Sequence, residues 1–232
     1  MKPETNIHPL QTRVLLALLF KPGARFGELR QRNVPSDQLT FHLKALLQAK
    51  LIRREGNFYY LTSRGKEFAN RFDTEQKAIE RQAKVGVCVV AVKKEKGQTC
   101  YLFQQRLKEP YFGFHGFVTG KIRWGERIEE TARREFLEET GLTGKFKFCG
   151  VEHKMDYNKE GEMLEDKFFF VFKATDVRGE FISEFPGGKN LWIGLKNVSR
   201  LKNLFKDVEK LLAMVKRASL SFREDKYQES RY

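Results

Sequence analysis

Three glutamates near the middle of the chain have the spacing of a divalent-metal site. Glu135, Glu138 and Glu139 are three and four residues apart, so a helix over 126–140 would place their carboxylates on one face. Like charges packed in this way repel one another, and a hard cation such as Mg²⁺ would turn that repulsion into coordination. Metal-assisted attack of water is a common route to splitting a phosphoanhydride. The spacing therefore predicts a metal site, with a solvated acidic helix face as the alternative.

Glycines flank this acidic stretch. Gly113, Gly116 and Gly120 precede it and allow close approach of the backbone, so a main-chain carbonyl of this loop is a candidate to complete the site. Gly141 follows the predicted helix, where a left-handed residue commonly ends one. The net charge of the whole chain is +14, so a focused acidic cluster is out of character with the rest. That contrast argues against the solvated acidic face.

The stretch 120–142 resembles the Nudix box, Gly-x5-Glu-x7-Arg-Glu-U-x-Glu-Glu-x-Gly-U, in which U is hydrophobic. All positions of the motif are matched: Gly120, Glu126, Arg134, Glu135, Phe136, Glu138, Glu139, Gly141 and Leu142. The resemblance extends over about 85–218. It implies the Nudix fold, an α/β/α sandwich with a mixed sheet, and hence a chain of the α/β class.

The resemblance also implies the metal ligands and the reaction. Glu135, Glu138, Glu139 and the carbonyl of Gly120 would bind Mg²⁺, with Mn²⁺ as the alternative ion. Water would attack one phosphorus of a pyrophosphate linkage in a nucleoside diphosphate joined to another group. The small-molecule partner implied is therefore a nucleoside diphosphate derivative.

Three residues of the box are implied to serve catalysis. Arg134 would orient the carboxylates, through Glu126 or through a glutamate of the cluster. Glu138 is the first candidate for the general base, and Glu180 or Glu184 in a later loop is the second. Each of these roles comes from the resemblance.

The chain departs from common members of the family at two places. Val118-Thr119-Gly120 stands where many members have Pro-Gly-Gly, which puts the shape of this loop in doubt. Arg123 stands at a position that is often acidic in the family. Its two alternative roles are a phosphate contact and a surface charge. Arg106, at the end of a predicted strand, has the same two alternatives. Neither departure changes an implied metal ligand, because Gly120 itself is kept.

The first 80 residues follow a different pattern. Apolar periodicity predicts helices over 9–20, 26–32, 36–51 and 63–83, and Glu55-Gly56-Asn57 predicts a hairpin turn before the last helix. This order, with the runs 43–52 and 60–65, resembles a winged helix-turn-helix domain over residues 8–72. The chain is thus expected to divide into a small, mainly α winged-helix domain at 1–80, a Nudix domain at 81–222 and a charged, frayed tail at 223–232.

The winged-helix resemblance implies binding to double-stranded DNA. In such domains the third helix enters the major groove and the wing contacts the backbone. Residues 1–84 hold 16 Lys or Arg and 8 Asp or Glu, an excess that favours a polyanionic partner. The alternative is a winged helix that serves only protein contacts or dimerisation, and a homodimer is the default for such domains. The candidate DNA contacts are Gln38, Thr40, His42 and Lys44 on the third helix, and Arg53 and Arg54 on the wing.

The remaining pattern predicts strands over 85–92, 99–105, 146–149 and 167–173, and a closing helix over 198–217. Three isolated cysteines without metal-ligand spacing indicate a reduced compartment. No stretch is long and apolar enough to span a bilayer, so we expect a cytoplasmic protein without a membrane partner.

Two functions are consistent with these features. The first is a magnesium-dependent Nudix hydrolase with an appended winged helix. The second is a transcription regulator whose Nudix domain senses a nucleotide such as ADP-ribose or a relative of NAD. The complete box favours the enzyme, and nothing in the sequence identifies the nucleotide.

Overall fold

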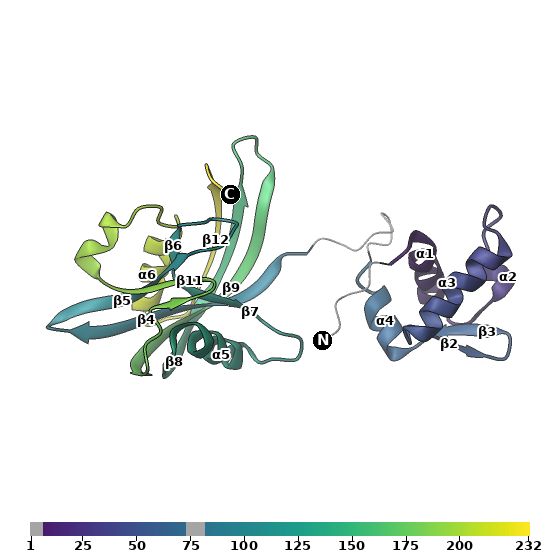
Figure 1. Ribbon diagram of the computed structural model, residues 1–232, viewed down its shortest axis with the longest axis horizontal. Helices are drawn as coiled ribbons and strands as arrows, with labels where there is room; N and C mark the ends of the chain where they lie inside the picture. The colour runs from purple at the N-terminus through teal and green to yellow at the C-terminus, as the bar shows by residue number, and fades with distance from the viewer. Residues whose placement is uncertain (1–6, 73–81) are drawn as a thin grey trace. The chain divides into compact units, whose positions relative to one another are not determined.

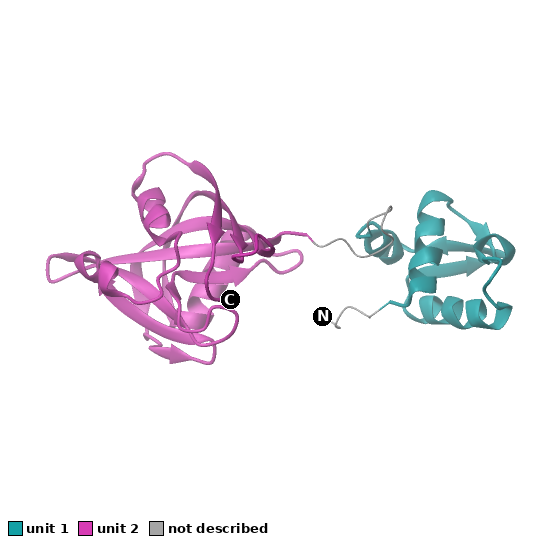
Figure 2. Ribbon diagram, turned by 90° about the horizontal axis from the view of Figure 1, so that it is seen from above, with its two compact units in different colours: residues 1–81 teal, residues 82–232 magenta. Residues whose placement is uncertain are grey.

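The computed structural model describes residues 7–72 and 82–232. The chain divides into two compact units, 1–81 and 82–232 (Figure 2). The boundary predicted near residue 80 lies outside the described residues. Each unit has its own hydrophobic core.

Within residues 7–72, the first unit combines four helices with a three-stranded antiparallel sheet of order β1-β3-β2. Its elements are α1 (Pro9–Phe20), β1 (Ala24–Arg25), α2 (Phe26–Leu29), α3 (Ser36–Gln48), β2 (Ile52–Glu55), β3 (Phe58–Leu61) and α4 (Ser63–Ala69). The predicted order of three helices, a hairpin and a helix is confirmed, and the short strand β1 was not predicted.

The ends of these helices follow from local chemistry. Pro9 occupies the first turn of α1, where a missing N–H costs nothing. The Oγ1 atom of Thr62 accepts a hydrogen bond from the N–H of Gly65 at 2.9 Å and thereby caps α4. Helix α4 ends at Ala69, earlier than the predicted helix over 63–83, whose part at 73–81 lies outside the described residues. Buried leucines of α1 and α3, among them Leu15, Leu39 and Leu43, form the core.

The second unit is built on a nine-stranded mixed sheet (Figure 1). The main order is β10-β11-β5-β4-β9-β8-β12, with β6 beside β5 and β7 beside β4. The pairs β4–β9 and β8–β12 are parallel and the other pairs are antiparallel. The strands are β4 (Lys84–Glu95), β5 (Gln98–Arg106), β6 (His115–Gly116), β7 (Val118–Lys121), β8 (Leu142–Tyr157), β9 (Met163–Gly179), β10 (Glu184–Phe185), β11 (Gly188–Gly194) and β12 (Ser221–Gln228).

Helices cover both faces of this sheet. Helix α5 (Ile128–Thr140) packs on one face, where Ala132 and Phe136 join a core that includes Val87 and Val89 of β4. Helix α6 (Val208–Lys216) packs on the other, in the core that contains Cys88 and Val90. The apolar run in β4 is continuous because alternate side chains enter two different cores. The predicted α/β/α sandwich is confirmed.

The predicted closing helix over 198–217 is wrong in extent. A 3₁₀ helix, η1 (Leu195–Arg200), and α6 occupy its two ends. Between them the backbone N–H of His115 donates to the carbonyl of Asn203 at 2.8 Å, and that of Phe205 donates to the carbonyl of His115 at 3.0 Å. These bonds tie the intervening segment to β6, so its backbone is not free to form a helix.

The predicted frayed tail at 223–232 is also wrong. Its first residues belong to β12, which pairs in parallel with β8 from Ser221 opposite Gly150 to Gln228 opposite Tyr157. Charges that suggested a solvated end find partners here: Glu224 contacts His153 of β8 at 2.7 Å, and Asp225 accepts from Lys210 of α6 at 2.5 Å. None of the helices in residues 7–72 and 82–232 is long and apolar enough to cross a membrane.

Candidate active site

Helix α5 carries the acidic residues of the motif and is fixed at both ends. At its start the backbone N–H of Arg127 donates to Glu130 Oε2 at 3.3 Å, and Gly141, with φ of 71°, ends it in the left-handed conformation predicted from the sequence. Phe136 and Ala132 are fully buried against the sheet. Their burial fixes the rotation of the helix, and Glu135 on another face of α5 lies against β7.

Arg134 links three carboxylates of the motif. Its Nε and Nη2 atoms donate to the two carboxylate oxygens of Glu126 at 2.6 and 2.9 Å, in a bidentate pair. Its Nη1 atom donates to Glu135 at 2.7 Å and to Glu138 at 3.2 Å. The hydrogen bonds from Arg134 lower the pKa of Glu126 to about 2. Both contacts expected of Arg134, to Glu126 and to the cluster, are therefore present.

Gly120 lies directly against Glu135. A Cβ atom added to Gly120 would come within 2.0 Å of the Glu135 Cγ atom, and one added to Gly86 would come within 2.5 Å of the Gly120 carbonyl oxygen. Gly86 and Val87 of β4 pair with Lys121 and Gly120 of β7. Only glycine permits this approach of a carboxylate to a strand backbone.

Glu139 is a half-buried carboxylate of the cluster with two polar neighbours. Its Oε2 atom accepts a hydrogen bond from Gln104 Nε2 at 2.9 Å, and Asn190 Nδ2 donates to its backbone carbonyl at 2.7 Å. Burial raises the pKa of Glu139, and the charge on Glu135 adds to the increase. An additional positive charge at this point would relieve both effects.

The donor set at α5 fits a hard divalent cation. Glu135, Glu139 and the carbonyl of Gly120 supply oxygen atoms, the ligands that Mg²⁺ and Mn²⁺ take. Among the described residues no group of three or more His, Cys, Asp or Glu side chains is already arranged around a common point. The carboxylates instead make hydrogen bonds to Arg134 and Gln104.

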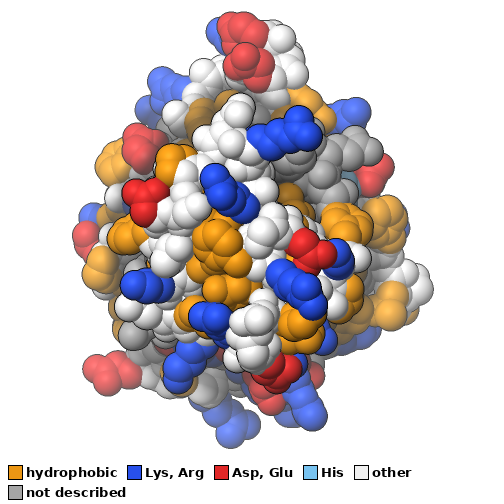
Figure 3. Space-filling model, turned by 90° about the vertical axis from the view of Figure 1, so that its right-hand side faces the viewer, with side chains coloured by type: hydrophobic (Ala, Val, Ile, Leu, Met, Phe, Trp, Pro, Cys, Tyr) orange, Lys and Arg blue, Asp and Glu red, His pale blue; other side chains and the backbone are white. Residues whose placement is uncertain are grey.

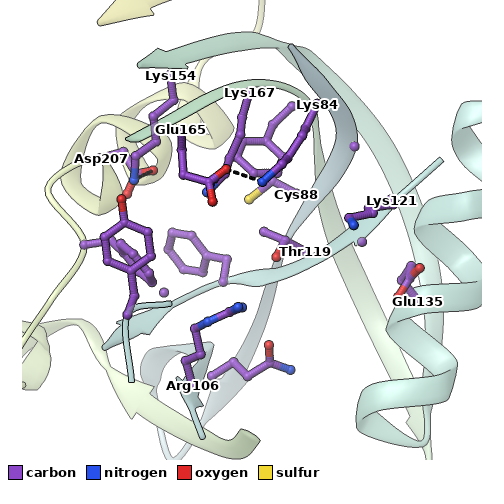
Figure 4. Close-up of a pocket in the computed structure, with 18 of the residues that line it drawn as sticks. Lys84, Cys88, Arg106, Thr119, Lys121, Glu135, Lys154, Glu165, Lys167 and Asp207 are labelled. Carbon is purple, nitrogen blue, oxygen red and sulfur yellow. Dashed lines mark hydrogen bonds and ion pairs between the residues drawn. The ribbon is translucent and has the colours of Figure 1, made fainter. Parts of the chain in front are cut away.

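A cavity of about 550 Å³ opens beside this cluster (Figure 4). Glu135, Glu139 and Gly120 line one part of it, and the start of α6 contributes Asp207 and Leu211. Its lining is both charged and aromatic. The basic lining residues are Lys84, Arg106, Lys108, Lys121, Lys154 and Lys167; the aromatic ones are Tyr111, Phe117, Phe169, Phe185 and Phe205. Such a lining suits a ligand with an anionic part and a flat part.

Arg106, at the end of β5, is one of the basic residues that line the cavity. Its Nη2 atom donates to the carbonyl of Glu109 at 3.2 Å and its Nε atom donates to the carbonyl of Pro110. No carboxylate within 4.0 Å pairs with it among the described residues. Burial lowers the pKa of the guanidinium, which the charges of Glu165 and Glu139 partly offset. Arg106 is half-buried and lines the cavity, which is consistent with the phosphate contact among its two alternatives.

The sequence reasoning missed a group of charged residues on the strands behind the cavity. Glu165 accepts from Lys84 Nζ at 2.5 Å, and Lys154 Nζ lies 3.0 Å from Asp207. A signal was present, because Glu152, Lys154 and Asp156 alternate along β8 and so share one face of the strand. All three are buried.

The candidates for the general base lie elsewhere. Glu138 is half-exposed, pairs with Arg134 and with Arg123 at 3.6 Å, and does not line the cavity. Arg123 therefore contacts a carboxylate of the motif. Glu184 pairs with Lys189 at 3.2 Å, and neither it nor Glu180 lines the cavity.

Most candidate DNA contacts in the first unit are exposed, and His42 is not. Gln38, Lys44, Arg53 and Arg54 are exposed, and Thr40 is half-buried with its hydroxyl donating to the carbonyl of Ser36 at 2.7 Å. His42 is buried, with its ring stacked on His8 at a centroid separation of 4.1 Å. The expectation that His42 faces outward is wrong, because His8 at the start of α1 covers it.

The two wing arginines stack on aromatic rings. Arg53 lies over Tyr60 at 4.9 Å and Arg54 over Tyr59 at 5.6 Å, measured from the guanidinium carbon to the ring centroid. Residues 7–72 hold 12 Lys or Arg and 4 Asp or Glu. Figure 3 shows one face of the molecule, on which basic side chains are interspersed with apolar ones.

Comparisons with known proteins agree with the geometry of the second unit. An oxidized purine nucleoside triphosphate hydrolase of Danio rerio is 36% identical over 86 residues, which cover 32% of this chain and 47% of that protein. The chain thus spans about half the length of this curated relative. The Mutator MutT protein of Bacillus halodurans matches with 27% identity and a TM-score of 0.52, over 62% of this chain and 90% of that one.

The fold is also that of the NUDIX domain of Shewanella oneidensis NrtR, solved in complex with ADP ribose. The match has 18% identity and a TM-score of 0.52, over 67% of this chain and 97% of that one. The family model of the NUDIX domain matches residues 82–215, which is more than half of the chain. By this match and by its fold, the chain belongs to the family of NUDIX-domain proteins.

Proposed function

We propose that the chain is a divalent-metal-dependent hydrolase of a pyrophosphate linkage in a nucleoside diphosphate derivative. The observation that carries the proposal is the packing of Glu135 against Gly120, with Arg134 orienting it and the half-buried Glu139 on the same helix. Carboxylate oxygens held this closely suit a divalent cation. The six basic residues that line the adjoining cavity suit a phosphate chain.

Each part of the site has a task in this proposal. Glu135, Glu139 and the carbonyl of Gly120 hold Mg²⁺ or Mn²⁺, with Glu138 as a further ligand or as the acceptor of the proton from water. The cation supplies Lewis-acid stabilisation of the phosphate oxygens and favours ionisation of the attacking water. Arg134 keeps the carboxylates oriented through its bidentate contact with Glu126. Arg106 donates to a non-bridging phosphate oxygen.

The relatives support a nucleotide as the substrate. The Danio rerio relative is named for oxidized purine nucleoside triphosphates, and the NrtR domain was solved with ADP ribose. The charged and aromatic cavity is consistent with either kind of molecule. The products of the hydrolysis screen described next identify the group that leaves the pyrophosphate linkage.

A hydrolysis screen tests this proposal. The purified full chain is incubated with ADP-ribose, NADH, nucleotide sugars, dinucleoside polyphosphates and nucleoside triphosphates, with and without Mg²⁺ or Mn²⁺, and products are separated by chromatography. We expect metal-dependent turnover of at least one substrate and its loss in Glu139→Gln. Glu129→Gln, an exposed position on the same helix, is the matched control. No turnover in the full screen, or unchanged turnover in Glu139→Gln, would overturn the proposal.

A second function is favoured by the first unit. We infer that it is a winged-helix domain that binds double-stranded DNA, so that the nucleotide cavity also acts as a sensor. The support is the charge excess of residues 7–72, with Gln38 and Lys44 exposed on α3 and two arginines on β2. A homodimer on a two-fold site is part of this inference.

Fluorescence anisotropy with duplex fragments from the neighbourhood of the chain's own gene tests the second function. We expect binding that weakens as salt concentration rises, because phosphate contacts release counterions. Lys44→Ala and Arg53→Ala are expected to weaken binding, while Lys145→Ala, an exposed lysine of the second unit, is the control. A folded chain that binds no duplex at low salt would exclude DNA binding.

A further inference from the structure

Glu152 on β8 is a buried carboxyl group for which the hydrolysis reaction has no use. It is 0% exposed, and neither of its oxygen atoms has a hydrogen-bond partner among the described residues. No ion pair within 4.0 Å involves it in that part of the chain. An isolated buried carboxylate is very costly, so the group is held in its neutral form.

The surroundings of Glu152 agree with a neutral carboxyl. The groups that act on it are Asp207 before α6, Lys154 on the same strand, Asp225 and Arg223 on β12, and Cys88 on β4. Lys154 already pairs with Asp207 at 3.0 Å, and Arg223 pairs with Asp225 at 3.1 Å. Burial, followed by the charge on Asp207, raises the pKa of Glu152 to about 8.

Glu152 lines the same cavity as the carboxylates of α5, and flat apolar groups lie beside it. Its cross-strand partner is Phe169 on β9, which also lines the cavity. The ring of Phe205 lies 4.7 Å from the Nζ atom of neighbouring Lys154 and is a third lining residue. A neutral carboxyl presents one donor and one acceptor side by side. Next to aromatic rings, this is the complement of a flat heterocycle with an acceptor beside an N–H group.

We propose that Glu152 is the specificity-determining residue for the base of the nucleotide, and that its neutral carboxyl donates to a ring nitrogen or carbonyl and accepts from the adjacent N–H. The inference rests on the proposed function, because it takes a nucleotide to occupy the cavity. The shared chemistry is a donor–acceptor edge, which adenine and cytosine present as an amidine and hypoxanthine and uracil as a lactam. A carboxylate would instead suit the two-donor edge of guanine.

Calorimetric binding without metal tests the inference independently of catalysis. The probes are AMP, CMP, IMP, UMP and GMP, with ribose 5-phosphate as the reference that lacks a base. At pH 6.5 we expect at least one of the first four nucleotides to bind about tenfold or more tightly than ribose 5-phosphate. A ligand without a base leaves the buried carboxyl unpaired, and a site built to hydrogen-bond a ligand discriminates against such an analogue by at least this factor. The tightest of the four identifies the edge that is recognised.

Two variants separate recognition from a structural role. Glu152→Gln keeps a neutral donor and acceptor, so it is expected to retain the advantage of the base, whereas Glu152→Leu is expected to lose it. For AMP and CMP, whose bases do not titrate between pH 6.5 and pH 9.5, the advantage should fall over this range in the unaltered chain, because the carboxyl loses its proton, and should persist in Glu152→Gln. Glu209→Gln, exposed on α6, is the control and should match the unaltered chain. If Glu152→Leu does not fold, the pH comparison with Glu152→Gln still decides.

Each contrary result is specific. Equal binding of ribose 5-phosphate and all five nucleotides, a preference for GMP at pH 6.5, or an advantage that survives in Glu152→Leu would overturn the role of Glu152. Base discrimination without any hydrolysis would contradict the proposed function and leave the nucleotide subsite standing. Hydrolysis without base discrimination would do the reverse.

Discussion

Arg134 and Glu126 form a two-bond pair in which Nε lies 2.6 Å from Oε1 and Nη2 lies 2.9 Å from Oε2. The remaining nitrogen of the guanidinium reaches Glu135 at 2.7 Å. Glu126 therefore fixes the plane of Arg134, and Arg134 in turn fixes the carboxylate that lies against Gly120. Lysine has the charge of arginine but not this planar fork.

Arg134→Lys is expected to lower kcat/KM by about 10- to 100-fold, in line with the effect of losing residues that orient metal ligands. The carboxylates would keep a nearby cation but lose their fixed orientation. The measurement is the steady-state rate on the best substrate of the screen, as a function of Mg²⁺ concentration. Arg133→Lys on the same helix, whose partner Glu129 is exposed, should change the rate less than threefold. Equal effects of the two variants would show that orientation by Arg134 does not matter.

Gly120→Ala is expected to abolish most activity. The new Cβ would lie 2.0 Å from Glu135 Cγ and 2.1 Å from its Cδ, so the carboxylate must leave its place against β7. We expect at least a 100-fold loss of kcat/KM at saturating Mg²⁺, measured beside circular dichroism to confirm folding. Gly27→Ala is the control, since a Cβ there meets nothing within 4 Å. An active Gly120→Ala variant would place the metal ligands elsewhere.

His153 makes the stability of the second unit dependent on pH. Its Nδ1 lies 2.7 Å from Glu224 of β12 and its Nε2 lies 2.8 Å from Asp166 of β9. Partial burial opposes the charged ring, but the hydrogen bonds to Glu224 and then Asp166 outweigh it and raise the pKa of His153. A raised pKa means that the stabilisation is complete below the unfolded value of about 6.5 and is lost as pH rises through the folded value.

Urea unfolding at several values between about pH 5.5 and pH 8.5 measures this effect. The unaltered chain should lose free energy of unfolding across that range relative to His153→Gln, which cannot carry the charge. His115, whose Nδ1 contacts the carbonyl of Lys202, offers a comparison variant without a carboxylate partner. The same pH dependence in the unaltered chain and in His153→Gln would rule out His153 as the source of the effect.

The sequence predicted a feature correctly where local pattern alone decides it, and failed where a contact with a distant segment decides it. The run 85–92 predicted a buried strand correctly because β4 is covered on both faces. The motif on α5 placed Glu135 and Glu139 at the cavity because residues four apart share one face of a helix, whereas Glu138 does not line the cavity. His42 was misplaced because its neighbour, His8, belongs to another helix. The tail was misjudged because charged residues are exposed on average, and those of β12 find partners only once β8 is in place.

The cavity marks the limit of such reasoning most clearly. Glu152 and Lys154 alternate in the sequence like the outer face of a half-buried strand, and that pattern is ordinarily solvated. They are buried because α6 lies over this face of the sheet, with Asp207 at its start. Their burial depends on contacts between segments that are distant in the sequence. Such contacts cannot be inferred from the pattern of a single sequence.

Lys154→Met is expected to lower the free energy of unfolding by about 3–5 kcal/mol, the usual cost of removing one partner from a buried pair. The Nζ atom of Lys154 lies 3.0 Å from Asp207 and 3.7 Å from Asp156, and all three side chains are buried. Methionine fills a similar volume, so the loss would report the uncompensated carboxylates rather than a void. Denaturant unfolding of the second unit gives the difference.

Lys145→Met provides the matched control for that experiment. Lys145 pairs with Asp176 at 2.8 Å on the surface, where both side chains are more than half exposed. Such pairs contribute about 0–1 kcal/mol. A large difference between the two variants would identify Lys154 as the cation that allows acidic groups to line the cavity. Equal, small effects would instead mean that Asp207 and Asp156 become protonated or hydrated when the lysine is removed, and the buried charge network would then contribute little to stability.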